Sequence, residues 1–121
     1  MPFDFFNPDD KLEMPSNSIA FTQSALEQVG EKHEKFINFL LRKNPRLCVH
    51  IEPLFELYDK ESLVDNIAMR YSKKRGYLQN YLTEIQKLEE EGKAKIIEVR
   101  RLFSGGLYHE SSLLVWKPIS L

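Results

Sequence analysis

The sequence predicts a single α+β domain in which helices precede a C-terminal β-hairpin. Three observations predict this class. The length of 121 residues, 42% of them hydrophobic, fits one small core. Apolar residues recur at helical spacing as far as Leu88, and from Ile96 onward they alternate with polar ones. Gly92 separates the two patterns, so the change of period marks the passage from helices to strands.

Residues 1–18 are expected to form an N-terminal arm, with residues 19–121 as the folded domain. Pro2, Pro8 and Pro15 interrupt this stretch too often for a continuous helix. The arm also carries an aromatic cluster of Phe3, Phe5 and Phe6. Such a cluster is unusual in a solvated tail, so we expect it to pack on the domain or on a second subunit, with a disordered tail as the alternative.

A long first helix is predicted after the arm. Thr22 can act as its N-cap, and an apolar stripe at helical spacing continues from Leu26 to Leu41. Asn44-Pro45 ends the helix, because proline disfavours helical geometry at the residue before it.

A short strand is expected to follow this helix. Leu47, Val49 and Ile51 alternate with Cys48 and His50, which is the period of a strand with one buried face. For residues 52–58 the pattern leaves both a helical turn and an extended segment open.

Two further helices and a hairpin complete the expected fold. Asp59 or Ser62 can cap a helix that extends to Tyr71, and a second helix is expected to start at Ser72 and to end at Gly92. Two strands follow, over residues 96–103 and 107–116. Between them the run Ser104-Gly105-Gly106 is typical of a hairpin turn.

The order of these elements resembles the winged helix-turn-helix superfamily. The resemblance covers Ser62 to Ile97, SLVDNIAMRYSKKRGYLQNYLTEIQKLEEEGKAKII, about half the chain once the hairpin is included. Leu63, Ile67 and Ala68 stand where the supporting helix of that fold places its buried face. The resemblance implies one winged-helix domain with a helix-turn-helix and wing over residues 59–118 and a recognition helix. The long N-terminal helix predicted from its apolar stripe would precede them.

The charge distribution makes double-stranded DNA the expected partner. The net charge is only −1, but residues 70–101 carry nine Lys and Arg against five Asp and Glu. A helix that starts at Ser72 would be basic at its leading end and acidic at its trailing end, which opposes its own macrodipole and favours a binding role. The expected contacts on this turn and the start of the helix are Ser72, Lys73, Lys74, Arg75, Tyr77, Gln79 and Asn80.

Side-chain chemistry assigns roles within that set. Lys73 and Lys74 are expected to contact phosphates, and Arg75 a phosphate or a guanine. Gln79 and Asn80 have the amide groups that read adenine edges. The alternative is a solvated basic turn without a partner.

The hairpin supplies a second expected contact. Arg100 and Arg101 lie near its turn, where an arginine can reach a phosphate or a minor groove. Neighbouring strand residues point to opposite faces, so only one of the two can do so. The alternative for either is an ion pair with Glu98 or Glu110.

Catalysis, metals and cofactors are not expected. His33, His50 and His109 do not have metal-ligand spacing, and no phosphate loop, nucleophile elbow or paired-carboxylate motif is present. The segment IAFTQSALEQV, residues 19–29, is similar to the start of A-type iron–sulfur carriers, but those bind through three cysteines and this chain has Cys48 alone. The lone cysteine, the acidic start and the lack of a long apolar run favour a cytoplasmic protein with no membrane contact.

These observations lead to two functional hypotheses. The first is a small DNA-binding transcriptional regulator that dimerises through its N-terminal helix and arm, because one recognition helix makes too few contacts for operator affinity. The second is a winged-helix protein-interaction module, an adaptor or a phage- or plasmid-encoded binder of host machinery, with Phe3, Phe5 and Phe6 as its contact.

Overall fold

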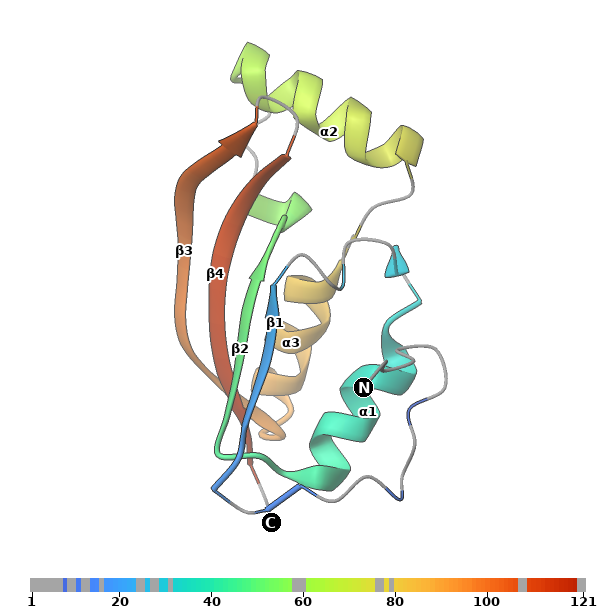
Figure 1. The fold of residues 1–121 in the computed structure, drawn as a ribbon, viewed down its shortest axis with the longest axis vertical. Helices are drawn as coiled ribbons and strands as arrows, with labels where there is room; N and C mark the ends of the chain where they lie inside the picture. Colours follow the sequence, from blue (N-terminus) through green and yellow to red (C-terminus); the bar gives the residue numbers. More distant parts are fainter. Residues whose placement is uncertain are drawn as a thin grey trace.

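The computed structural model describes residues 8, 11, 14–15, 17–23, 26, 29–30, 32–57, 61–75, 78, 80–106 and 109–119. The elements in chain order are β1 (Ile19–Gln23), α1 (Glu34–Lys43), β2 (Leu47–Glu52), the 3-10 turn η2 (Phe55–Leu57), α2 (Leu63–Arg75), α3 (Tyr81–Glu90), β3 (Ala94–Gly106) and β4 (His109–Pro118). Figure 1 shows α1 and α3 beside the four strands, with α2 across one end of the sheet. Within these residues, no helix is long and apolar enough to cross a bilayer.

The four strands form one mixed sheet in the order β1-β2-β4-β3. The outer pair β1 and β2 is parallel, with Ile19 opposite Leu47, and α1 provides the crossover that a parallel pair requires. The pairs β2–β4 and β4–β3 are antiparallel. Thus β4 lies inside the sheet, and the C-terminal hairpin is continuous with the first half of the chain.

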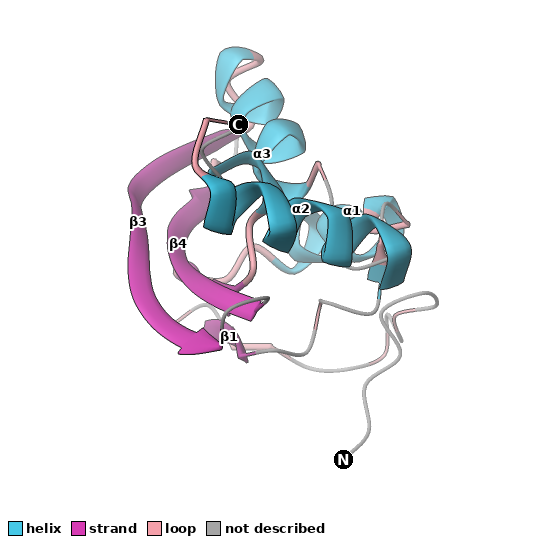
Figure 2. Ribbon diagram, turned by 90° about the horizontal axis from the view of Figure 1, so that it is seen from above, coloured by secondary structure: helices cyan, strands magenta, loops and turns pink. Residues whose placement is uncertain are grey.

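The core lies between the inner face of the sheet and two of the helices. In Figure 2 the strands curve around the helices, which all lie on the concave side. Helix α1 buries Phe36, Ile37, Phe39 and Leu40 there, and α3 buries Tyr81, Leu82 and Ile85. Both helices show the strong apolar stripe that such packing needs.

The predicted long N-terminal helix is wrong. Thr22 lies inside β1 with its side chain buried against His50, and Gly30 has a φ of 67°, which an α-helix does not accommodate. Helix α1 therefore starts only at Glu34, although Leu26 and Val29 are buried in the same core. The predicted end is confirmed, because Asn44 adopts the left-handed conformation that terminates the helix.

The winged helix-turn-helix prediction is also wrong. Helix α2 continues through Ser72 to Arg75, so no recognition helix begins at Ser72, and α3 begins only at Tyr81. The predicted hairpin exists as β3 and β4, but its predicted turn is wrong, because Ser104-Gly105-Gly106 ends β3 and Gly105 and Gly106 pair with Glu110 and His109. In addition, β4 pairs with β2 along five residue positions. In its described residues the chain forms an α+β domain with a four-stranded mixed sheet and three short helices, which has more strands than a winged-helix layout.

Strand β2 differs from an ordinary half-buried strand, because its polar side chains face the core and its large apolar side chains face outward. Its buried residues are Cys48, His50 and Glu52, whereas Leu47, Val49 and Ile51 point to the outer face and are half-buried. The alternation predicted for this strand is confirmed. The residues that face the core are Cys48 and the polar His50 and Glu52, however, and the apolar residues face outward.

Candidate interaction surfaces

A buried polar cluster holds the centre of the fold together. His50 Nδ1 lies 2.8 Å from Thr22 Oγ1, and its Nε2 lies 3.0 Å from both Trp116 Nε1 and the Tyr81 hydroxyl. Because an indole N–H can only donate, His50 Nε2 accepts and the proton of the neutral ring is on Nδ1, which donates to Thr22. This one side chain thereby links β1, β4 and α3.

The surroundings keep this cluster neutral. Burial lowers the pKa of His50 to about 3 and raises the pKa of Cys48 to about 12. Desolvation likewise raises the pKa of Tyr81 above its usual range. Glu52 Oε1 accepts a hydrogen bond from the Leu26 backbone N–H at 3.1 Å. Since His50, Cys48 and Glu52 are fully buried, these groups cannot meet a substrate and their role is structural.

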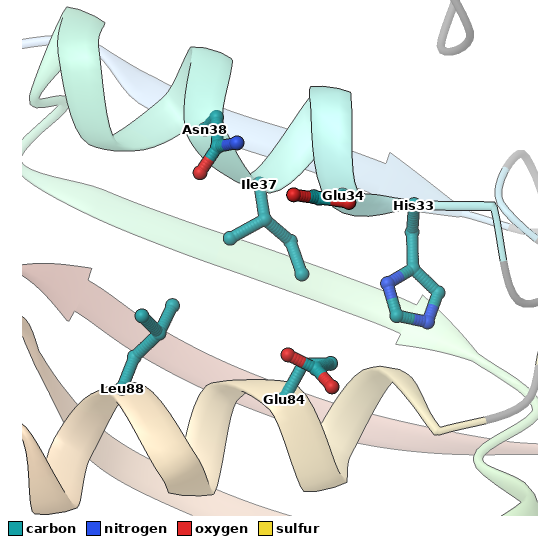
Figure 3. A pocket seen from close by; sticks show the side chains of 6 residues that line it. All are labelled: His33, Glu34, Ile37, Asn38, Glu84 and Leu88. Atoms are coloured by element: carbon teal, nitrogen blue, oxygen red, sulfur yellow. The ribbon is translucent and has the colours of Figure 1, made fainter.

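A shallow cleft of about 260 Å³ separates α1 from α3, lined by His33, Glu34, Ile37, Asn38, Glu84 and Leu88. Figure 3 shows Glu34 and Glu84 on facing helices, with the His33 ring at one end. The His33 ring packs edge-on against Tyr81 at 5.2 Å, so it belongs to the same aromatic core as His50. Among the described residues, no group of His, Cys, Asp and Glu side chains can hold a metal ion.

Arg101, one of the expected DNA contacts, lies in an ion pair. Its guanidinium donates two hydrogen bonds to the Asp65 carboxylate, at 2.7 and 3.0 Å, and a longer one to the Leu57 carbonyl. Asp65 is buried near the start of α2, and its backbone N–H donates a hydrogen bond to Ser62 Oγ. Arg101 therefore joins β3 to α2 and points to the inner side of the sheet.

The other expected DNA contacts are divided between separate elements. Ser72, Lys73, Lys74 and Arg75 form the last turn of α2, where the macrodipole favours cations rather than opposing them. Asn80 precedes α3 in a left-handed conformation, with φ of 63°. Arg100 is exposed on the outer side of β3, 3.7 Å from Glu98. Tyr77, Gln79 and the aromatic cluster Phe3, Phe5 and Phe6 lie outside the described residues.

The outer face of the sheet carries a largely apolar surface on three adjacent strands. Strand pairing aligns its outward residues in three rows: Ile19, Leu47, Lys117 and Lys95; Phe21, Val49, Val115 and Glu98; Gln23, Ile51, Leu113 and Arg100. Seven of these twelve are apolar, and Ile19 and Phe21 are 53% and 56% exposed. We call the seven residues on β1, β2 and β4 the apolar block.

The apolar block was missed by sequence reasoning. Its signal was present in β1, where Ile19 and Phe21 alternate with Ala20 and Thr22, but the helical spacing of later residues concealed it. In the described part of the chain, the helices all lie on the opposite side of the sheet, and none covers the block (Figure 2).

The fold and these surfaces define a small α+β domain. Comparisons with family models, with curated proteins and with solved structures gave no match.

Proposed function

We propose that this protein is a protein-interaction module that binds another polypeptide through the apolar block. The single observation that carries the proposal is that seven of the nine outward-facing residues on the adjacent strands β1, β2 and β4 are apolar. A sheet with one face in water normally alternates apolar residues inward with polar residues outward. Here Cys48, His50 and Glu52 face inward, and Leu47, Val49 and Ile51 face outward. This reversal costs solvation free energy that a partner would recover.

The size of the block favours a single helix as the partner. Three strands about 4.8 Å apart and three outward rows about 6.7 Å apart span about 14 by 20 Å. A helix with its side chains is about 10–12 Å wide, and about 13 residues cover 20 Å. A stable contact with a second folded copy usually buries about 800 Å² of accessible surface and about 20–30 residues per partner, far more than the seven residues of the block.

The charges beside the block favour an acidic flank on that helix. Lys95 and Lys117 are exposed and directly opposite each other in the β3–β4 pair, and like charges in this position are destabilising. Arg100 adds a third cation, compensated by Glu98. We therefore expect an amphipathic helix with leucine-like residues over Phe21, Val49 and Val115 and carboxylates toward Lys95 and Lys117.

The test uses two synthetic amphipathic helical peptides with the same apolar stripe, one flanked by Glu and one by Lys. Titration of the ¹⁵N-labelled protein is expected to shift the amide signals of Phe21, Val49 and Val115 with the Glu peptide, at micromolar Kd. The Lys peptide is expected to bind at least several-fold more weakly.

Val115→Thr should weaken binding of the Glu peptide, whereas Gln86→Ala on the exposed side of α3 should not. Shifts confined to other surfaces would contradict the proposal. Concentration-dependent dimerisation through the same residues, seen by sedimentation, would replace the helical partner with a second copy.

A further inference from the structure

Helix α2 is attached to the domain differently from the other two helices. Among its described side chains Asp65 is buried, Ile67 and Met69 are half-buried, and Leu63 is 76% exposed. Its described anchor is the Arg101–Asp65 pair at the end where β3 finishes. The exposed side chains among those described on α2 are Leu63, Arg70, Lys73 and Lys74, and the helix lies at the end of the molecule away from the chain between α1 and β2 (Figure 1).

The accessible part of α2 is strongly basic. Arg70, Lys73 and Lys74 are exposed and stand at positions i, i+3 and i+4, which places them on one side of the helix. Residues 66–75 contain no Asp or Glu, and the one carboxylate within α2, Asp65, is compensated by Arg101. Residues 66–75 therefore carry a formal charge of +4 although the whole chain has a net charge of −1, and the carboxylate of Glu61 lines only the adjoining hollow.

The basic residues border a concave surface. A hollow of about 330 Å³ is lined by Asn66, Met69, Arg70 and Lys73. It combines an amide and two cations, groups that contact phosphate oxygens and sugars in nucleic-acid complexes, with the flexible apolar side chain of Met69. An adjoining hollow shares Asn66 and Arg70 and extends toward Leu63.

We propose that this face of α2, formed by Asn66, Arg70, Lys73 and Lys74, binds the phosphodiester backbone of a nucleic acid without reading its sequence. The contact differs from the expected recognition helix, because it uses the C-terminal half of α2 and needs no base contact. It is also separate from the apolar block, which lies on the outer face of the sheet.

The helix macrodipole offers a competing account of the same charges. Cations in the last turn of a helix are stabilised without any ligand, which explains Lys73 and Lys74. The effect falls off within that turn and does not explain Arg70, one turn earlier. It also gives no reason for the lack of carboxylates over ten residues or for the hollow between Asn66 and Lys73.

The experiment measures fluorescence anisotropy of a labelled 20-base-pair DNA duplex and of a single strand of equal length at several salt concentrations. About three phosphate contacts predict a slope of about −2.7 in log K against log salt for the duplex and about −2 for the single strand. Affinity for the duplex should then fall about 40-fold between 50 and 200 mM salt.

The triple variant Arg70→Gln, Lys73→Gln, Lys74→Gln should lose most of this binding and its salt slope. The matched control Lys32→Gln, Lys35→Gln, Lys87→Gln makes the same charge change on exposed sites outside α2 and should keep both. Equal loss in the two triples would overturn the proposal, as would a wild-type protein that fails to bind at tens of micromolar in low salt. Circular dichroism checks that both triples are folded, and Val115→Thr should bind the duplex normally.

Discussion

The two faces of the sheet present opposite chemistry. The inner face, covered by α1 and α3, contains buried polar groups such as His50 and Glu52, each held by specific hydrogen bonds. The outer face carries apolar residues such as Phe21, and no described helix covers it. Buried polar groups need fixed partners, whereas exposed apolar groups gain by acquiring one. The inner face therefore maintains the fold, and the outer face is available for binding.

The largest expected effect comes from removing His50. His50→Ala leaves a cavity and takes the acceptor from the Trp116 indole N–H, so we expect the free energy of unfolding to fall by about 3–5 kcal/mol. Val49→Ala, on the next residue of the same strand but facing outward, should cost about 1 kcal/mol or less. Urea denaturation measures both. Similar losses would mean that the two faces do not differ as described.

The Arg101–Asp65 pair should rank next. Arg101→Ala leaves the buried Asp65 carboxylate without its cation, and we expect a loss of about 2–4 kcal/mol with faster hydrogen exchange in α2. Arg100→Ala removes an exposed partner of Glu98 and should cost less than about 0.5 kcal/mol. Exchange rates of α2 amides that stay unchanged in Arg101→Ala would show that another contact holds the helix.

Acid should weaken the inner face through His50. Its pKa is about 3 in the folded protein and 6.5 in the unfolded chain, so the unfolded state binds more protons. The contribution of His50 to stability is complete above pH 6.5 and is lost as the pH falls toward 3, by about 2–3 kcal/mol at pH 4.5. Denaturation of wild type and His50→Gln across this range isolates the effect. Parallel pH profiles would contradict it.

The smallest effect on stability is expected at the apolar block. Val115→Thr keeps the β-branched shape on the outer face. The free energy of unfolding should therefore change by less than about 1 kcal/mol, while binding of the Glu-flanked peptide weakens. Leu114→Ala, one residue away on the inner face, should cost about 2–4 kcal/mol. A greater loss from Val115→Thr than from Leu114→Ala would reverse the assignment of the faces.

Local signals in the sequence determined several elements. Asn44-Pro45 ended α1, the alternation after Leu47 marked β2, and the change of period at Gly92 separated α3 from the hairpin. Each depends on dihedral restrictions or periodicity within a few residues, so the sequence alone was sufficient. It also located the basic run Lys73-Lys74, although it attached that run to the following helix.

Only the tertiary structure decided how these elements combine. Pairing of β1 with β2, 28 residues away, turned Thr22 from a helix cap into a strand residue bonded to His50. The bond from Arg101 to Asp65 spans 36 positions and converted an expected DNA contact into an anchor. Tyr81 and Trp116 decided that His50 and the alternate residues of β2 face the core. A buried imidazole is tolerated only where distant groups satisfy its nitrogens.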